Sequence, residues 1–272
     1  MRWLIILKIL IFCFILFIRC NSNSLDDSDS DLEELFSSQQ YNEVIEKCNL
    51  VLETSESKKA LRYRGKSFLK LGKNKEAYSD FVKLYQIGDT SIETMEGLAI
   101  SNANIGQLDR AYKIFQKLII KDKNNSKNHY YLGLLCLKMN KNDEALKYFD
   151  LAIDLSPNNV EYLNKMGFIL QEMGQYKKSI PYFSRIINNK SNSDTFYVNR
   201  AVSYMYIGEF DSSIIDLSKA ISIKGSNGFY FYQRAIAYMF KKEKEKCCLD
   251  IEKAKSLGYL ISGDDEVVKY CN

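Results

Sequence analysis

Hydrophobic and polar positions repeat along this chain with a period of thirty-four residues. In each unit a small residue is followed twelve positions later by a second small residue, and four positions after that by a large apolar one. The first column holds Gly65, Ala99, Gly133, Gly167, Ala201 and Ala235, the second Ala77, Ala111, Ala145, Ser179, Ser213 and Cys247, and the third Phe81, Phe115, Phe149, Phe183, Leu217 and Ile251. Small residues let two helices approach closely, and a large side chain beside them fills the groove. The pattern predicts two packed helices per unit.

Turn residues divide and close each predicted helix pair. Seven positions after the first small residue comes Gly72, Gly106, Gly174 or Gly208, while Asn140 and Lys242 occupy that place in the other two units. Glycine and asparagine tolerate the left-handed backbone that ends a helix in a tight turn. Polar clusters such as KNNSKN and SPNN then separate the units. With only two prolines and thirteen glycines in 272 residues, the chain is expected to be mostly helical.

These columns resemble the tetratricopeptide repeat, whose thirty-four-residue signature joins aromatic positions, Leu-Gly, Ala-x-x-x-Phe and a closing proline. The third unit carries the fullest copy, although His129 and Cys136 stand where aromatics are usual; its matching positions are His129, Leu132, Gly133, Cys136, Ala145, Phe149 and Pro157. The resemblance implies an all-α fold, a right-handed α-solenoid of about six to seven helix-turn-helix repeats. Terminal repeats of such an array need covers for their apolar faces.

The chain is predicted to have five parts. The segment DLEELFSSQQYNEVIEKCNLVLE resembles a degenerate repeat shifted by one residue, and DDEVVKYC resembles a short amphipathic cap. The predicted parts are a signal peptide or membrane anchor over 1–20, an acidic disordered linker over 21–31, a degenerate N-terminal repeat over 32–57, six tetratricopeptide repeats over 58–257, and a C-terminal capping helix over 258–272.

The first twenty residues, MRWLIILKILIFCFILFIRC, differ in kind from the rest. Positive charge at Arg2 and Lys8 precedes an unbroken apolar run over 9–18, which has the length of a signal-peptide core. A cysteine follows at Cys20, so the segment resembles a bacterial lipoprotein signal with Cys20 as the lipidation site, although small residues do not precede it. An uncleaved anchor and a plain secreted protein are the alternatives. All three place the body in the cell envelope or outside the cell, and not in the cytosol.

Charge and composition restrict the class of partner. The formal charge of +4 falls to +1 when residues 1–19, with three positive charges, are removed. A nearly neutral body does not supply the basic face that binds nucleic acid. The acidic run that begins at Asp26 is interpreted as a solvated tether.

The sequence contains no motif that indicates catalysis. There is no phosphate-binding loop, no dinucleotide fingerprint and no nucleophile elbow, and the single histidine, His129, lies in a packing column. The cysteines lack metal-ligand spacing, although a disulfide between Cys271 and either Cys247 or Cys248 is open. We therefore expect no enzyme activity, no cofactor, no metal and no small-molecule substrate.

The resemblance also implies where a partner binds, because in this family the first helix of each pair lines the concave face. When the concave positions of the family are carried onto this sequence column by column, the predicted peptide-binding groove consists of Arg62, Lys66, Tyr130, Leu134, Phe168, Val202, Met205, Tyr206, Tyr232, Ile236, Met239 and Phe240. The groove should grade from basic at its N-terminal end to apolar and aromatic at its C-terminal end. The alternative is that Met205, Tyr206, Met239 and Phe240 are covered by neighbouring repeats or by the terminal helix.

One function of the family is not expected. Members that bind chaperone tails use a clamp of lysine, asparagine and arginine, but Gly97 and Tyr131 occupy its later positions here. The expected function is a non-catalytic protein–protein interaction scaffold or adaptor at the cell envelope, tied to the membrane through its N-terminus. The alternative is a regulatory or substrate-presenting subunit of an envelope enzyme or secretion complex.

Overall fold

The structure is a computed structural model that describes residues 31–189, 193–263 and 265–272. Within these ranges the regular structure is helical and no strand is present, as the all-α prediction requires. The chain divides into two compact units, residues 1–141 and residues 142–272. The predicted signal or anchor, the lipidation site Cys20 and residues 21–30 of the predicted linker lie outside the described residues.

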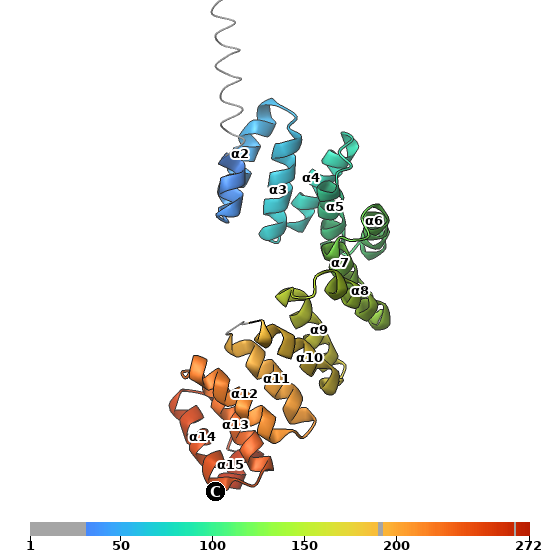
Figure 1. Cartoon of the computed structure of the whole chain (residues 1–272). Coiled ribbons are helices and arrows are strands. Elements are labelled where there is room, and N and C mark those ends of the chain that lie inside the picture. The colour runs from blue at the N-terminus through green and yellow to red at the C-terminus, as the bar shows by residue number, and fades with distance from the viewer. Residues whose placement is uncertain (1–30, 190–192, 264) are drawn as a thin grey trace, which may run out of the picture. The chain divides into compact units, whose positions relative to one another are not determined.

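The N-terminal unit is a series of antiparallel helices in which each packs against the next (Figure 1). A short helical stretch over 31–37 comes first. It is followed by α2 (Tyr41–Thr54), α3 (Lys58–Lys70), α4 (Asn74–Gln86), α5 (Ile92–Asn104), α6 (Leu108–Lys121) and α7 (Ser126–Lys138).

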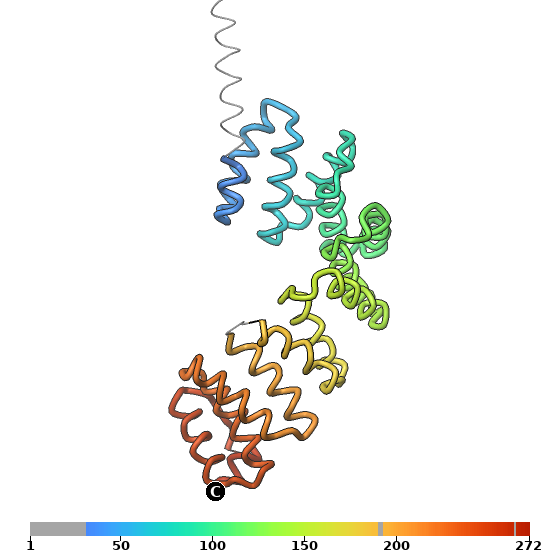
Figure 2. The backbone as a smooth tube through the Cα atoms, in the orientation of Figure 1, coloured from blue at the N-terminus to red at the C-terminus, as the bar shows by residue number. Residues whose placement is uncertain are grey.

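The C-terminal unit continues the same alternation, and the backbone trace shows its helices side by side with short turns between them (Figure 2). Its helices are α8 (Asn142–Leu155), α9 (Val160–Glu172), α10 (Tyr176–Asn188), α11 (Asp194–Tyr206), α12 (Phe210–Ile223), α13 (Gly228–Phe240), α14 (Lys244–Ser256) and α15 (Glu266–Cys271). The short helix α15 contacts both α13 and α14.

Helix boundaries follow the predicted period. The first helices of the pairs begin at residues 58, 92, 126, 160, 194 and 228, and the second helices begin at 74, 108, 142, 176, 210 and 244, so both series advance by thirty-four. Side chains of Ser57, Ser91, Asn125 and Asn159 accept a hydrogen bond from a backbone N–H in the first turn of the helix that follows. These caps satisfy N–H groups that have no partner inside the helix. The polar clusters between units therefore start the next helix.

The predicted columns form the core. Phe81, Phe115, Phe149 and Phe183 are almost completely buried, as are Leu217 and Ile251 at the same position of the later units. The small residues of the second column are fully buried as well. Close approach is tight enough that a Cβ on Gly167 would lie 2.7 Å from the ring of Phe183. Burying each phenyl ring stabilises the fold by about 1.5–3 kcal/mol, and only a small residue leaves room for it.

The turns inside the pairs have left-handed backbone at all six expected places. Gly72, Gly106, Gly174 and Gly208 have φ between 71° and 87°. Asn140 and Lys242, which replace glycine in two units, adopt the same conformation with φ of 58° and 62°. The fold therefore imposes this geometry even on a lysine, where it costs free energy.

Both ends of the described chain have additional helical structure. At the N-terminal end, Leu32, Val44, Cys48 and Ala60 form a buried cluster. At the C-terminal end, Val267 and Val268 of α15 pack on Ala235, Cys247 and Ile251. The division of the ends into a degenerate repeat and a capping helix stays a prediction. No helix within 31–189, 193–263 and 265–272 is long and apolar enough to cross a membrane.

Candidate functional site

The C-terminal unit contains an uncharged groove of about 570 Å³, which we call the C-terminal groove. Side chains from α11, α12, α13 and the turn between α11 and α12 surround it. Its lining residues are Met205, Tyr206, Gly208, Phe210, Tyr232, Gln233, Ile236 and Phe240. Five of these positions had been predicted as groove residues, namely Met205, Tyr206, Tyr232, Ile236 and Phe240, while Gly208, Phe210 and Gln233 had not.

Two pairs of aromatic rings lie along this groove. Tyr206 stacks on Tyr176 with ring centroids 4.1 Å apart and an interplanar angle of 1°. Phe240 stacks on Phe210 with centroids 5.0 Å apart and an angle of 4°. Tyr206 remains 67% exposed and Phe240 55% exposed. The neighbouring repeats therefore support these two rings without covering them.

Other predicted members of the groove are partly covered. Tyr232 donates a hydrogen bond from its hydroxyl to Asp265 Oδ2 at 2.6 Å, and Asp265 caps α15. Burial of Tyr232, together with this bond, raises the pKa of its hydroxyl to about 12. Ile236 and Met239 pack against the core cluster that includes Val267 and Val268. The terminal helix α15 thus covers part of the predicted groove. For Met239 this agrees with the alternative prediction, in which the terminal helix covers it.

The N-terminal unit has a second groove of about 370 Å³, which we call the N-terminal groove. First helices α3, α5 and α7 supply most of its lining: Phe36, Lys66, Leu69, Lys70, Phe81, Glu93, Glu96, Gly97, Ile100, Asn104, Lys127 and Tyr131. Lys66 Nζ lies 2.5 Å from Glu93 Oε1, and Lys127 Nζ lies 2.6 Å from Glu96 Oε2. Lys66 of α3 and Lys127 of α7 are therefore each paired with a glutamate of α5.

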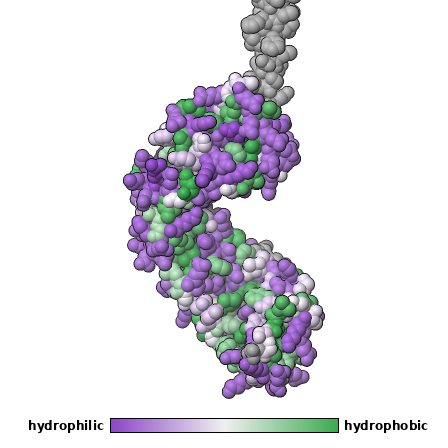
Figure 3. Space-filling view, turned by 180° about the vertical axis from the view of Figure 1, so that it is seen from behind, coloured by the Kyte–Doolittle hydropathy of each residue, from purple (hydrophilic) through white to green (hydrophobic). Residues whose placement is uncertain are grey.

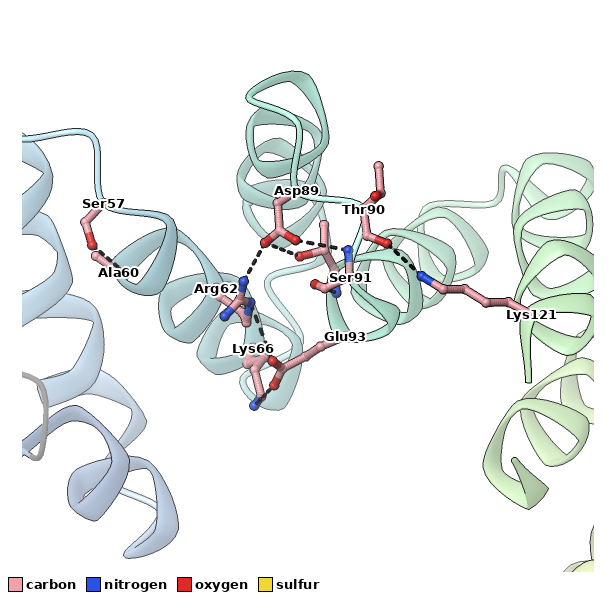
Figure 4. Close-up of polar contacts among 10 residues, drawn as sticks. Ser57, Ala60, Arg62, Lys66, Asp89, Thr90, Ser91, Glu93 and Lys121 are labelled. Carbon is pink, nitrogen blue, oxygen red and sulfur yellow. Dashed lines mark hydrogen bonds and ion pairs between the residues drawn. The ribbon is translucent and has the colours of Figure 1, made fainter. Parts of the chain in front are cut away.

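The charge of Arg62 is compensated in the same way. Its Nη2 donates to Asp89 Oδ2 at 2.5 Å, and its Nε lies 3.5 Å from Glu93 Oε2 (Figure 4). Asp89 also accepts from the Ser91 backbone N–H and from Thr94 Oγ1. Burial opposes ionisation of Asp89, but these hydrogen bonds outweigh it and hold the pKa of the carboxyl well below its ordinary range. The structure corrects the expectation of a basic end, because acids at the start of the next repeat neutralise Arg62 and Lys66.

The remaining predicted residues have different environments. Tyr130 is buried, with only 6% of its surface exposed. Leu134 is half-buried and lines a small pocket of about 100 Å³ with Ile100 and Phe115. Phe168 is 45% exposed on α9, and Val202 is half-buried on α11. Hydrophobic side chains thus reach the surface in patches among hydrophilic ones (Figure 3).

A series of arginine–aspartate bridges was missed by the sequence analysis. Arg200 binds Asp216 through two hydrogen bonds of 2.7 Å, and it also donates to Ser184 Oγ on the preceding helix at 3.0 Å. Arg234 repeats the arrangement with Asp250 and with Ser218. The third bridge joins Arg64, Asp80 and Asn49. The bond to aspartate raises the pKa of each arginine despite its burial.

These bridges had a recognisable signal. Arginine and aspartate lie sixteen residues apart at the same two positions of three units. Each arginine joins its own helix to the second helix of its pair and to the second helix of the preceding pair. The triads therefore connect consecutive repeats.

Three cysteines meet at the C-terminal end. Cys248 and Cys271 form a disulfide with Cα atoms 5.3 Å apart, so α15 is covalently tied to α14. Cys247 Sγ lies 3.8 Å from Cys271 Sγ but remains a buried thiol, and burial raises its pKa to about 11. Of the two pairings left open by the sequence, the structure contains the one with Cys248.

Across the described ranges there is no group of three or more His, Cys, Asp and Glu side chains that could hold a metal ion. His129 is buried at the start of α7, where its Nε2 lies 2.9 Å from the Lys123 carbonyl oxygen. That contact is consistent with the packing role expected for His129.

Helix pairs that recur every thirty-four residues, with grooves along their first helices, define an α-helical repeat protein. A family model described as Tetratricopeptide repeat protein 21 N-terminal ARM repeat matches residues 36–246, and the chain belongs to this family. The predicted tetratricopeptide-type fold is therefore confirmed.

Solved structures show the same fold. The C-terminal part of a repeat-containing protein from Cytophaga hutchinsonii has a TM-score of 0.71 at 15% identity, over 90% of this chain and 99% of that one. A tetratricopeptide repeat protein from Parabacteroides merdae has a TM-score of 0.57 at 19% identity, over 89% and 96%. YrrB, described as a repeat protein with an unusual peptide-binding site, has a TM-score of 0.58 at 18% identity, over 70% and 96%. The curated proteins contain no match to the chain.

Proposed function

We propose that this protein is a non-catalytic interaction scaffold that holds a segment of a partner protein in its C-terminal groove. The observation that carries the proposal is the exposure of Tyr206 and Phe240 in an uncharged groove. Exposed clusters of large apolar side chains are typical of binding surfaces, and aromatic residues dominate the binding free energy at such surfaces. The peptide-binding site described for YrrB, which shares the fold, supports the same class of function.

We further propose that the scaffold works at the cell envelope, tied to the membrane through its N-terminal segment. The apolar run over 9–18 and Cys20 support an exported and lipidated chain. The Cys248–Cys271 disulfide supports an oxidising compartment, because such bonds are rare in the cytosol. Metabolic labelling with a fatty acid tests this location, and we expect the label on the natural chain but not on Cys20→Ser.

Affinity capture tests the groove. The tagged full chain is solubilised from cell envelopes beside a Tyr206→Lys, Phe240→Lys variant, and bound proteins are identified by mass spectrometry. The matched control is Ile215→Lys, Leu249→Lys, since these side chains are 69% and 59% exposed, lie one repeat apart in the same unit and do not line the groove. We expect a partner that the natural chain and the control retain and the groove variant loses. If the groove variant retains the same proteins as the natural chain, the proposal is wrong.

A further inference from the structure

The two aromatic pairs of the C-terminal groove are copies of one arrangement. Tyr206 and Phe240 are the last residues of α11 and α13, and their partners Tyr176 and Phe210 are the first residues of α10 and α12. Each pair is related to the other by thirty-four residues. The groove therefore presents two equivalent aromatic surfaces, one repeat apart.

Earlier units lack these surfaces. The positions equivalent to Tyr206 and Phe240 are Glu172, Lys138 and Asn104 in the preceding units. Asn104 instead makes a side-chain hydrogen bond to Asn74, thirty residues before it. The aromatic surfaces are thus confined to the last two thirty-four-residue repeats, which share one groove.

Stacking holds each ring in place before any ligand arrives. In Tyr176–Tyr206 and Phe210–Phe240 the planes are almost parallel, so the covered face of each exposed ring rests on its partner. Offset stacked rings attract each other by about 0.5–1.5 kcal/mol beyond their area burial. Because the rings are already ordered, a ligand that lies against them pays little additional conformational entropy.

One backbone conformation repeats on the scale of a helix–helix packing distance. Tyr206 and Phe240 lie on α11 and α13, which both pack on α12, and packed helices lie about 8–10 Å apart. A polyproline II helix rises about 3.1 Å per residue and completes a turn in three residues, or about 9 Å. Side chains three residues apart on such a segment would therefore face successive aromatic surfaces. An α-helix covers the same distance in six to seven residues, since it rises about 1.5 Å per residue.

The chemistry of the lining agrees with a neutral, proline-rich segment. None of the eight lining residues is charged. Proline rings are uncharged and pack flat on aromatic side chains, and Pro-rich segments bind aromatic-lined grooves with little loss of conformational freedom. All carbonyl groups of a polyproline II helix are free to accept hydrogen bonds, and the Gln233 carboxamide in the groove can donate one.

We propose that the C-terminal groove binds a partner segment in the polyproline II conformation, with prolines three residues apart against Tyr206 and Phe240. This rests on the proposed function and specifies the partner. The two prolines of this chain, Pro157 and Pro181, lie far apart in sequence, so the segment comes from another protein.

Three synthetic peptides of equal length and zero net charge test the proposal by fluorescence polarisation with the full chain in detergent micelles. The first repeats Pro-x-x-Pro, the second has the same residues rearranged so that no two prolines are three positions apart, and the third is an amphipathic helix without proline. We expect the first peptide to bind at least tenfold more tightly than the second. Tyr206→Ala and Phe240→Ala should each weaken it at least tenfold, whereas Tyr206→Phe and the control Ile215→Ala, Leu249→Ala should leave it unchanged.

The outcomes separate this inference from the proposed function. Equal binding of the first two peptides, or no binding of the first, overturns the inference. If only the helical peptide binds, and the Tyr206 and Phe240 variants weaken it, the groove still holds a protein segment but not one in the polyproline II conformation. Circular dichroism of each variant identifies any loss of binding that comes from unfolding.

Discussion

Arg200 on α11 and Asp216 on α12 are joined by two parallel hydrogen bonds of 2.7 Å, and both side chains are largely buried. The same guanidinium group reaches Ser184 on α10, so one side chain connects three successive helices. In the α5–α6 helix pair the equivalent positions hold Leu98 and Ile114, which belong to an apolar cluster. An ion pair and an apolar pair thus occupy the same two positions in different repeats.

Removing only the cation from this place should destabilise the C-terminal unit. Arg200→Leu leaves the Asp216 carboxylate buried without its partner, which costs about 3–5 kcal/mol. The double variant Arg200→Leu, Asp216→Ile recreates the apolar pair of the α5–α6 unit and should recover most of the loss. Urea denaturation of the full chain measures both. Equal losses in the single and double variants would show that the carboxylate is not the cause.

The close approach at Gly97 is expected to tolerate no side chain. A Cβ there would lie 2.2 Å from the buried ring of Phe81, so Gly97→Ala should destabilise the N-terminal unit by about 1–3 kcal/mol. Gly65→Ala is the matched control, because its Cβ would meet the same ring at 3.1 Å. Thermal unfolding should show a clearly larger loss for Gly97→Ala, and Phe81→Leu should reduce the difference between the two alanine variants.

The left-handed lysine at the α13–α14 turn offers a stabilising change. Lys242 has a φ of 62°, and an L-residue in this conformation carries a penalty of roughly 1–2 kcal/mol. Lys242→Gly should relieve it and raise the free energy of unfolding by ~0.5–1 kcal/mol, since glycine also loses more entropy on folding. Lys255→Gly inside α14 is the control and should lower stability. A lower melting temperature for Lys242→Gly would contradict the strain argument.

The Cys248–Cys271 disulfide should control the attachment of α15. Its sequence separation is 23 residues, and closing a loop of that size stabilises a protein by ~3 kcal/mol in the chain-entropy description. In Cys248→Ser we expect faster hydrogen exchange over α15 and at the neighbouring Tyr232. Cys247→Ala keeps the disulfide and introduces the residue found at this column in Ala77, so it should leave the exchange rates almost unchanged.

Alkaline pH should weaken the same region. Burial raises the pKa of Cys247 from 9.0 to about 11, so the unfolded chain loses this proton before the folded one does. The stability associated with the thiol is complete below pH 9 and is lost as the pH rises towards 11. The urea midpoint of the natural chain should therefore fall more between pH 8 and pH 10.5 than that of Cys247→Ala. Equal falls would show that Cys247 does not titrate as described.

The repeat register was predictable because it depends on contacts that every unit makes for itself. Phe81 and Phe183 are buried in the structure as their columns predict, and the turns at Asn140 and Lys242 keep the left-handed backbone. Side chains sixteen residues apart, such as Arg64 and Asp80, could also have been paired from the sequence once their shared spacing was noticed. These features follow from the period together with the size and charge of the residues.

The accessibility of the candidate site was less predictable. Tyr130 and Tyr206 both follow from the same first-helix columns, yet Tyr130 is buried and Tyr206 is 67% exposed. Met239 was expected in the groove, but it packs against the cluster that includes α15. Arg62 and Lys66 suggested a basic surface until Asp89 and Glu93 were found opposite them. Each difference depends on side chains outside the helix that carries the residue.

By itself, the sequence determined that the described chain folds into thirty-four-residue helix pairs, where the turns inside the pairs fall, and which residues form their cores. Periodic size and polarity are sufficient for this, because each pair buries its apolar stripe against its nearest neighbours in the chain. Only the tertiary structure decided that Tyr206 and Phe240 stay open, that Tyr232 is held by Asp265, and that Cys271 pairs with Cys248. Those outcomes depend on which side chains meet across different helices, and a periodic pattern does not record that geometry.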